Sequence, residues 1–325
     1  MKRSIRMAAV FALVSLCPYT GARAEIVTIE IPGAKRVIPT AINDKGQVTG
    51  YCDCKGSGYL GFIWRPNGDV VTFGVSGATI PAAISAAGVV TGYYYAGRTP
   101  LGFVRAADGT ITTFTAPHGH LTQPVAGNRK GWSVGNYRNG KIPGKLLFLR
   151  APSGEMTEFA VPGANGDEYV AAVNRSRTVA GVGRIRGGTG GFIRSADGTL
   201  TMFGDTSIDV AGMNDAGTIT GPVWVGEVRD SYVRTSDGTI TTFSAPNSTN
   251  TQALAINNSG TIVGTFFLES ETSWQGFIRT DDGTFTPIDP DGSGDVWVAA
   301  INNKGVFAGA YLGSDGLQHG FIGTP

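Results

Sequence analysis

The sequence predicts an all-β fold, a seven-bladed β-propeller with four-stranded blades. One unit recurs along almost the whole chain, and its clearest copy is Ala255–Ile288. This copy joins Ala-Ile-Asn-x-x-Gly-x-x-x-Gly to a later Gly-Phe-Ile-Arg-x-x-Asp-Gly-Thr. The repeat period lies in the low forties, and each period holds four short β-prone runs. A repeat of this length with four strands is typical of a propeller blade.

The Asn-x-x-Gly turn marks the first hairpin of each unit. Its Asn bonds to its own turn, and its Gly takes the positive φ that closes a short hairpin. The second unit begins this turn with Ser85, and the fourth ends it with Arg177 in place of Gly. The five complete turns begin at Asn43, Asn128, Asn214, Asn257 and Asn302.

The sixth unit shows how the four strands are placed. They are predicted at Gln252–Ile256, Thr261–Phe266, Gly276–Arg279 and Thr284–Ile288. Strand two ends in Gly in every unit, which predicts a close backbone approach between packed blades. Aromatic residues of strands three and four should fill the space between neighbouring sheets. These aromatics are Phe62, Phe103, Phe148, Phe192, Tyr232, Phe277 and Phe321 in strand three, and Phe73, Phe114, Phe159, Phe203 and Phe243 in strand four.

The two ends of the repeat region predict how the ring closes. The seventh unit stops after Gly320–Ile322 and lacks a fourth strand. The segment Ile26–Pro32 resembles the fourth strand and following turn at Ile111–Pro117. We therefore expect the N-terminal strand to complete the last blade, which would remove two open sheet edges. Residues 25–325 then form one propeller domain.

Residues 1–24 are predicted to be a signal peptide, so the protein is expected to be secreted or periplasmic. Lys2, Arg3 and Arg6 precede the short apolar stretch Met7–Cys17, and Ala22–Ala24 fits a cleavage site. The apolar stretch is too short to span a bilayer, and no later stretch is apolar enough. No membrane insertion is expected.

Charge and cysteine content exclude some classes of protein. Removing residues 1–24 takes four of the 26 basic residues and none of the 25 acids, which leaves an acidic excess of three. Without a basic excess, nucleic acid is not the expected partner. The remaining cysteines, Cys52 and Cys54, form either a local disulfide or two free thiols. The fold must depend on its core rather than on cross-links.

The unit resembles the bacterial extracellular HAF-repeat family. That family pairs a Gly-Ile-Asn-Asp-x-Gly-x-Ile-Val-Gly segment with His-Ala/Gly-Phe-Leu, Asp/Asn-Gly and often Val-Pro-Gly-Ala. The matching segments here are Ala41–Gly50, His319–Phe321, Asp282–Thr284, Ile31–Ala34 and Val161–Ala164. The resemblance covers essentially all of 25–325, although most units lack the His and the third has Leu147-Phe148 instead of Gly-Phe. It implies an exported propeller-like protein and no particular reaction.

Any binding site is expected on the end of the ring that carries the variable loops. Loops between strands two and three, and between blades, vary in length and chemistry, and such loops on a rigid scaffold often carry function. Aromatic rings beside polar groups suit sugars or flat ligands, and Arg can hold carboxylates or sulfates. The alternative is that these rings pack the loops onto the blades. The candidate ligand-binding residues are Tyr94, Tyr95, Arg98, His118, His120, Tyr137, Arg138, Trp224 and Trp297.

No metal or cofactor is expected, with zinc and calcium as the alternatives. His118 and His120 form a His-x-His pair that could bind zinc together with Cys52 and Cys54. The alternative is that both His lie in an exposed polar loop and bind no metal. Asp289 and Asp291 begin a calcium-like pattern that lacks the closing bidentate Glu, so a polar turn is the simpler interpretation.

The sequence contains no nucleophile-and-base constellation. It therefore favours an exported binding or interaction protein, a monomer, whose ligand is a carbohydrate or a protein. The alternative is an extracytoplasmic carbohydrate-active or lactone-cleaving enzyme, a lyase or hydrolase acting on the same face. Its acid and base could be Glu269 with Glu271, or Asp167 with Glu168. A purely structural role in an envelope or matrix is a third possibility.

Overall fold

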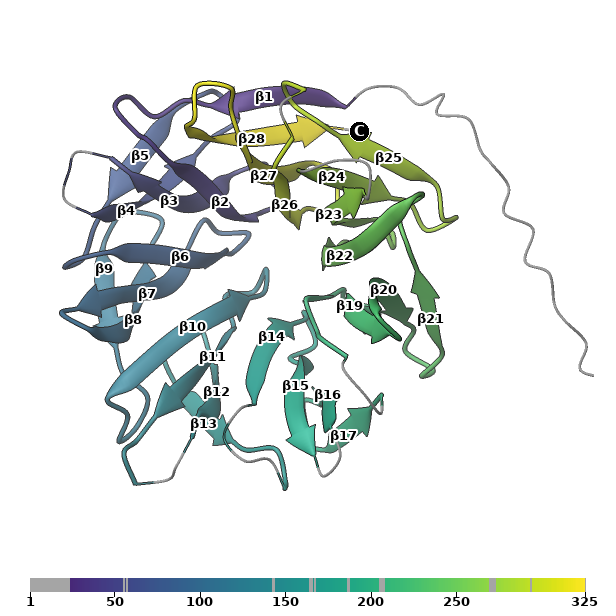
Figure 1. Ribbon diagram of the computed structural model, residues 1–325. Coiled ribbons are helices and arrows are strands. Elements are labelled where there is room, and N and C mark those ends of the chain that lie inside the picture. Colours follow the sequence, from purple (N-terminus) through teal and green to yellow (C-terminus); the bar gives the residue numbers. More distant parts are fainter. Residues whose placement is uncertain are drawn as a thin grey trace, which may run out of the picture.

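The computed structural model describes residues 24–324, apart from 55, 57, 142, 143, 164, 165, 167, 186, 187, 205–207, 269–272 and 293. The segment expected to be a signal peptide lies outside this range except for Ala24. The described residues form 28 strands and no helix. They therefore contain no helix that could span a membrane. The strands are arranged as a ring of sheets around a central channel (Figure 1).

The strands follow the repeat units of the sequence. In the first unit they are β2 (Val37–Ile42), β3 (Val48–Asp53), β4 (Tyr59–Trp64) and β5 (Val70–Phe73). In the second they are β6 (Thr79–Ile84), β7 (Val90–Ala96), β8 (Thr99–Arg105) and β9 (Ile111–Phe114). In the third they are β10 (Leu121–Gly127), β11 (Ser133–Arg138), β12 (Leu146–Arg150) and β13 (Met156–Phe159). In the fourth they are β14 (Tyr169–Val173), β15 (Val179–Ile185), β16 (Gly188–Arg194) and β17 (Leu200–Phe203).

The remaining units repeat this order. In the fifth unit the strands are β18 (Gly212–Met213), β19 (Ile219–Val225), β20 (Val228–Arg234) and β21 (Ile240–Phe243). In the sixth they are β22 (Ser248–Ile256), β23 (Ile262–Leu268), β24 (Trp274–Arg279) and β25 (Phe285–Ile288). In the seventh they are β26 (Val296–Ile301), β27 (Phe307–Leu312) and β28 (Gln318–Thr324), joined by β1 (Glu25–Ile29).

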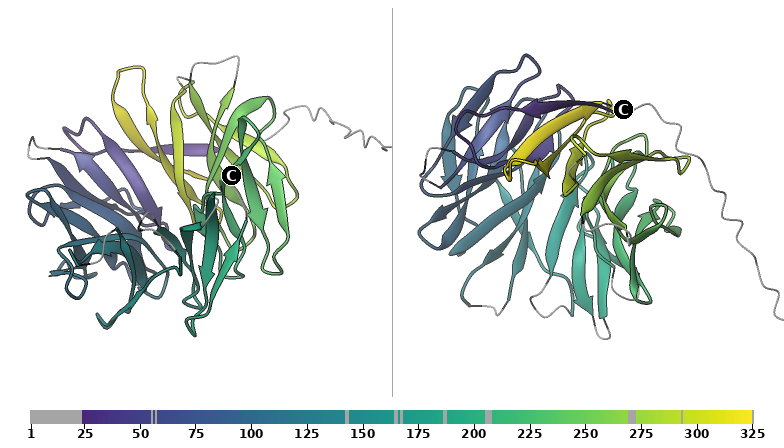
Figure 2. Two further views of the ribbon diagram at one scale, coloured as in Figure 1. Left: turned by 60° about the horizontal axis from the view of Figure 1, so that its bottom comes forward. Right: turned by 45° about the horizontal axis from the view of Figure 1, so that its top comes forward.

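Each unit is an antiparallel sheet of four strands whose first strand lies next to the channel. Within the described residues there are five four-stranded sheets and one eight-stranded sheet. The larger sheet arises because one parallel bridge, between Arg229 and Asn250, joins the fifth unit to the sixth. Successive hairpins place the Asn-x-x-Gly and Asp-Gly turns on one end, which we call the constant end. The other loops lie on the variable end (Figure 2).

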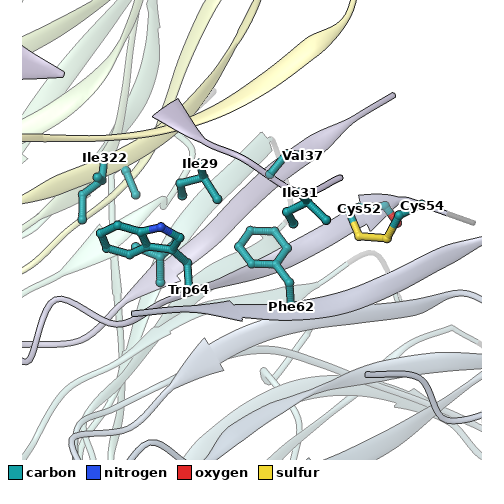
Figure 3. Close-up of a cluster of buried hydrophobic side chains, with 10 residues drawn as sticks. Ile29, Ile31, Val37, Cys52, Cys54, Phe62, Trp64 and Ile322 are labelled. Atoms are coloured by element: carbon teal, nitrogen blue, oxygen red, sulfur yellow. A yellow bond between two sulfur atoms is a disulfide. The ribbon is translucent and has the colours of Figure 1, made fainter. Parts of the chain in front are cut away.

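The N-terminal strand completes the last sheet, as the sequence predicts. β1 pairs antiparallel with β28, in a register that sets Glu25 opposite Thr324 and Ile29 opposite Gly320. Ile29 is almost fully buried, in a cluster that includes Trp64 of the first unit (Figure 3). The seam between the two chain ends is therefore closed by backbone bonds in one sheet and by apolar packing against the next.

Aromatic rings fill the space between neighbouring sheets, which confirms that prediction. Phe73 of the first unit packs edge-on against Phe103 of the second, with ring centroids 6.0 Å apart. Phe114 and Phe148 make the same contact one unit later, at 6.4 Å. The strand-three rings are fully buried. Contacts of this kind, repeated around the ring, bury a large apolar surface between the sheets, so the fold does not need a single central core.

The prediction for the strand-two glycines is wrong in two respects. These glycines do not end their strands, because β23, for example, continues from Gly264 to Leu268. A Cβ placed on Gly264 would lie 2.0 Å from the carbonyl oxygen of Gln252, in the first strand of the same unit. The close approach is therefore within one sheet, not between sheets. It occurs where a β-bulge between Ala253 and Ala255 shifts the register of β22 against β23.

Cys52 and Cys54 form a disulfide, which resolves the alternatives left open by the sequence. Their Cα atoms are 5.5 Å apart. Both residues are buried in the cluster that contains Phe62 and Ile31 (Figure 3).

Candidate functional site

The constant end of the channel is crossed by a network of hydrogen bonds. The Nδ2 of Asn257 donates to the carbonyl of Asn302 at 3.1 Å, and that of Asn302 donates to the carbonyl of Asn43 at 3.0 Å. Equivalent bonds run from Asn43 to Ser85, from Asn128 to Asn174 and from Asn214 to Asn257. Each of these five Asn side chains thus holds the next turn of the ring, and the bonds line the mouth of a channel cavity of about 290 Å³.

Arg129 spans this mouth between two carboxylates. Its Nη1 lies 2.5 Å from Oδ2 of Asp44, and its Nη2 lies 2.6 Å from Oδ2 of Asp215. Asn303 donates to Asp44, and Asn258 donates to Asp215. We call these five residues the collar. They join the first, third, fifth, sixth and seventh units across the channel.

Hydrogen bonding keeps the collar carboxylates ionised. Burial alone would raise the pKa of Asp44, but bonds from the backbone and side chain of Asn303 and from Arg129 outweigh it and lower the pKa. The pKa of Asp215 is lowered in the same way, because bonds from Asn258, Arg175 and Arg129 outweigh its burial. Both collar carboxylates pair with the one cation of the collar, Arg129, so the collar has one negative charge in excess.

The variable end contains two grooves. The first, of about 230 Å³, lies between the seventh and first units and is lined by Ile38, Tyr51, Asp295, Trp297 and Tyr311, among others. The second, of about 280 Å³, lies between the fifth and sixth units. Its lining residues are Trp224, Glu227, Arg229, Thr249, Asn250, Phe267 and Trp274.

A pair of tryptophans links the two grooves. Trp274 lines the second groove and Trp297 the first, and their ring centroids are 5.9 Å apart. Trp274 also contacts Phe267 at 5.5 Å. Trp224 and Trp297 are 50% and 47% exposed, which is unusual for such large apolar side chains. About half of each of these two side chains is therefore accessible to a ligand.

Tyrosine rings extend this surface beyond the first groove. Tyr51 lines that groove and contacts Tyr59 at 5.1 Å. Tyr93 and Tyr95, in the second unit, contact each other at 5.8 Å. Burial is the main cause that raises the pKa of Tyr93 in the second unit. Tyr51 of the first unit lies close enough to raise it slightly further. The set of rings that we call the aromatic arc comprises Trp224, Phe267, Trp274, Trp297, Tyr311, Tyr51, Tyr59, Tyr93 and Tyr95.

A polar cluster lies beside the second groove. The hydroxyl of Tyr169 donates to Oδ1 of Asp209, whose Oδ2 lies 3.8 Å from Nη2 of Arg229. Burial raises the pKa of Tyr169, and the bond to Asp209 raises it further, so this phenol stays protonated. The guanidinium of Arg229 lies over the ring of Trp224, 5.8 Å from its centroid. The cluster therefore places hydrogen-bonding groups next to an exposed aromatic face.

The hydroxyl of Tyr232 gives this unit a second polar feature. Tyr232 is fully buried, where the other units have Phe, and its hydroxyl has no hydrogen-bond partner among the described residues. Its pKa is raised by burial first and by the charge of Asp209 second. At this strand-three position the fifth unit therefore carries a polar atom in its core, where the other units carry Phe.

Three of the residues proposed from the sequence belong to the arc. Trp224 and Trp297 line the two grooves, and Tyr95 packs against Tyr93. Tyr94 and Tyr137 are instead buried in hydrophobic clusters. Burial, followed by a bond with Glu158, raises the pKa of Tyr137 to about 12. These two rings pack the sheets and do not face a groove.

The remaining proposed residues are exposed but line neither groove. Arg98 lies on the turn between β7 and β8. His118 and His120 lie on the loop between β9 and β10, where the backbone N–H of His120 donates to the carbonyl of Arg138 at 2.9 Å. The structure does not bring these four residues to the arc.

The described residues contain no group of three or more His, Cys, Asp or Glu placed to hold a metal ion. The proposed zinc partners of the His pair, Cys52 and Cys54, are joined in a buried disulfide, so they cannot serve as thiolate ligands. Asp289 Oδ1 accepts from the backbone N–H of Gly292, as a polar turn requires, and Asp291 is exposed beside it.

Of the four carboxylates considered as acid and base, only Glu168 lies among the described residues. Glu168 is buried, and its Oε2 accepts from the backbone N–H of Gly166. Asp167, Glu269 and Glu271 lie outside the described residues.

Sequence reasoning missed Tyr169, Asp209 and Arg229. A signal was present, because Tyr169 and Asp209 occupy one repeat position at a fixed spacing before the strand-two glycine. Aligning the units by that glycine would have shown a change from apolar to polar residues around the ring. The residues at this position are Ile38, Ile80, Gln123, Tyr169, Asp209, Gln252 and Trp297, each of whose carbonyls approaches its own strand-two glycine.

No protein-family model matches this chain, and no curated protein matches it. Solved structures do resemble it. Virginiamycin B lyase from Staphylococcus aureus is 14% identical with a TM-score of 0.61, covering 92% of this chain and 98% of that one. Oligogalacturonate lyase from Vibrio parahaemolyticus is 10% identical with a TM-score of 0.62, covering 93% and 98%.

A third structure is similar in architecture. The β-propeller domain of the trilobed protease from Pyrococcus furiosus is 12% identical with a TM-score of 0.68, covering 90% of this chain and 93% of that one. At such identities the likeness shows the fold alone. This chain is therefore a β-propeller built of four-stranded sheets. That propeller is described as having an open velcro topology, whereas here β1 pairs with β28.

Proposed function

We propose that this protein is an exported, seven-bladed β-propeller that binds a carbohydrate along the aromatic arc of its variable end. The seven blades correspond to the seven sequence units, with the eight-stranded sheet counted as two blades. The parallel bridge between Arg229 and Asn250 supports this count, because strand pairing between the fifth and sixth units is limited to that one residue pair. Export and membership of the HAF-repeat family rest on the sequence of residues 1–24 and on the repeat motifs.

The arrangement of Trp224, Trp274 and Trp297 carries the proposal. These rings form walls of two neighbouring grooves, and two of them are about half exposed. Sugar rings present flat C–H faces together with hydroxyl groups at their edges. Such ligands suit sites in which aromatic faces lie beside a few fixed polar groups. Asn250 and Arg229, in the second groove, supply such groups.

Replacement of single tryptophans tests this proposal. Wild-type protein should retain a carbohydrate on a glycan array, and Trp297→Ala and Trp224→Ala should each weaken its binding about tenfold or more, because central tryptophans often dominate binding. Ile240→Ala is the matched control, since Ile240 is an exposed apolar residue that lines neither groove. Retention of no glycan, or equal affinities for all four proteins by calorimetry, would contradict the proposal.

An enzyme acting on the same face is the second candidate. The cluster of Tyr169, Asp209 and Arg229 supports it, because it places a protonated phenol, a carboxylate and a guanidinium beside the second groove. Lyases among the similar propellers show that the fold is compatible with catalysis. Turnover of a bound glycan by wild type, lost in Asp209→Asn with binding retained, would establish this candidate. Absence of turnover in wild type would remove it.

A protein ligand is the remaining class. It would bind through the same exposed rings, and pull-down of a partner that free oligosaccharides do not displace would distinguish it from a glycan.

A further inference from the structure

We infer that the ligand of the arc is an uncharged, extended oligosaccharide that lies across both grooves. This inference rests on the proposed function, because it specifies the chemistry of a glycan at that same site. It depends on the size of the grooves, the link between them and the charges that line them.

The size of each groove argues against a compact ligand. Pockets that enclose a whole small molecule usually measure about 300–1,000 Å³. The first groove measures about 230 Å³ and the second about 280 Å³. Both volumes lie below that range, so each groove is better suited to hold one part of a longer ligand than to enclose a whole one.

The contact between Trp274 and Trp297 makes the two grooves one surface. The ring centroids are 5.9 Å apart, and the backbone N–H of Trp274 donates to Oδ1 of Asp295 at 3.2 Å. Asp295 and Trp297 line the first groove, and Trp274 lines the second. A chain of sugars can therefore follow a continuous set of rings from one unit to the next. A single sugar would use only part of this surface.

The charges of the grooves argue against an acidic glycan. Of the described residues that line them, Asp295 is the charged residue of the first groove, and Glu227 and Arg229 are those of the second. Arg229 is already engaged, because it lies 3.8 Å from Asp209 and over the ring of Trp224.

A uronate chain carries one carboxylate on each sugar and would need repeated cations along its path, of the kind that Arg supplies in bidentate pairs. The grooves instead present carboxylates, which would repel it. Hydroxyl groups of a neutral sugar can bond to those same carboxylates and to Asn250 without this penalty.

Calorimetry with oligosaccharides of matched length tests the inference. The probes are the uncharged chains cellohexaose, xylohexaose and mannohexaose, the acidic chain hexagalacturonate, and the trisaccharide of each series. At least one uncharged hexasaccharide should bind about tenfold or more tightly than its trisaccharide, because only the longer chain reaches both grooves. Its affinity should change less than twofold between about 0.05 and 0.5 M NaCl, since salt screens charge interactions. Hexagalacturonate should bind at least tenfold more weakly.

The tryptophan variants locate the binding. Trp297→Ala, in the first groove, and Trp224→Ala, in the second, should each reduce the advantage of the hexasaccharide over the trisaccharide to less than about threefold. Ile240→Ala should leave that advantage unchanged.

The possible results separate the inference from the function on which it rests. Preferred, salt-sensitive binding of hexagalacturonate that the tryptophan variants weaken would overturn the inference and leave a carbohydrate function intact. Equal affinity for trisaccharide and hexasaccharide would also overturn it. Binding of none of the probes, together with an empty glycan array, would overturn both.

Discussion

The side chain of each constant-end Asn holds its own turn and the next one. Oδ1 of Asn257 accepts from the backbone N–H groups of Ser259 and Thr261, while its Nδ2 donates to the carbonyl of Asn302. The residue is almost fully buried. Alanine at this position would remove the acceptor of the Ser259 and Thr261 N–H groups and one of the two donors to the Asn302 carbonyl, which also accepts from Gly305. A polar group left unsatisfied away from water costs about 1–3 kcal/mol.

Asn257→Ala is therefore expected to lower the free energy of unfolding by at least about 2 kcal/mol. Urea denaturation followed by tryptophan fluorescence measures this change. Asn67→Ala is the control, because Asn67 bonds to Asp69 in an exposed turn and joins no second unit. A loss as small as that of the control would mean that the inter-unit bonds contribute nothing measurable.

The collar makes stability depend on pH through Asp44 and Asp215. Their folded pKa values lie below the ordinary 3.8. The stability that ionisation provides is thus fully present above that pH, and it is lost as the pH falls through the folded values. Arg129→Gln should lower the free energy of unfolding by about 1 kcal/mol at pH 7, because the pairs are partly exposed.

The difference between the wild type and Arg129→Gln should shrink between pH 7 and about pH 2, because the carboxyls take up protons as the pH falls through their folded pKa values. Denaturation curves recorded at both pH values check the expectation. A difference that persisted unchanged at low pH would show that Arg129 acts through packing instead of through its charge.

Arginines at the third strands connect neighbouring units. Arg150 lies over the ring of Phe114 in the preceding unit, 4.5 Å from its centroid, and its Nη1 donates to the carbonyl of Ala151 at 3.3 Å. Four further junctions repeat this arrangement, pairing Arg105 with Phe73, Arg194 with Phe159, Arg234 with Phe203 and Arg279 with Phe243. At the closing junctions Trp64 and Gly323 occupy the Arg position, so the ring is sealed there by apolar contacts.

Arg150→Met should cost about 1–2 kcal/mol of stability, since it removes a cation–π contact and a charged hydrogen bond while keeping much of the side-chain volume. Arg138→Met is the matched control, because Arg138 is exposed at the end of β11. Thermal unfolding compares them. A melting temperature as high as that of the control would rule out a role for the Arg–Phe junctions.

The strands could be predicted from the sequence because the repeat fixes their spacing. In the sixth unit, Gln252–Ile256 was expected to be a strand, and β22 covers Ser248–Ile256. The extra residues pair with the long end of β23, where Ser248 lies opposite Leu268. That extension depends on the partner strand, which a local pattern does not show.

The candidate site could be predicted only in part. The sequence placed Trp224 and Trp297 in or beside the variable loops, and both line grooves, at the end of β19 and the start of β26. Position near a loop could not distinguish Tyr95 from its neighbour Tyr94. Successive side chains of a strand point to opposite faces, so Tyr95 is exposed and Tyr94 is buried in the core. The contact between Trp274 and Trp297 joins two units, so it depends on how neighbouring sheets are placed in the ring.

Closure by β1 determines whether the whole ring is stable. Ile29→Asp places a charge in the buried seam and should lower the free energy of unfolding by at least about 3 kcal/mol. Val27→Asp is the matched control, because Val27 lies on the same strand and is 50% exposed, so its effect should stay within about 0.5 kcal/mol. Urea denaturation of both variants measures the difference. Equal stabilities would mean that β1 does not seal the ring.

A ring with one constant end and one variable end should bind its ligand at the variable end alone. Hydrogen exchange measured by mass spectrometry, with and without the tightest-binding uncharged hexasaccharide, tests this most directly. Ligand should slow exchange in the hairpin of β19 and β20, around Trp274 and at the start of β26, which carry the grooves. Exchange at the constant-end turns Asn43–Gln47 and Asn257–Thr261 should not change. Protection of those turns, with none at the grooves, would contradict the proposed site.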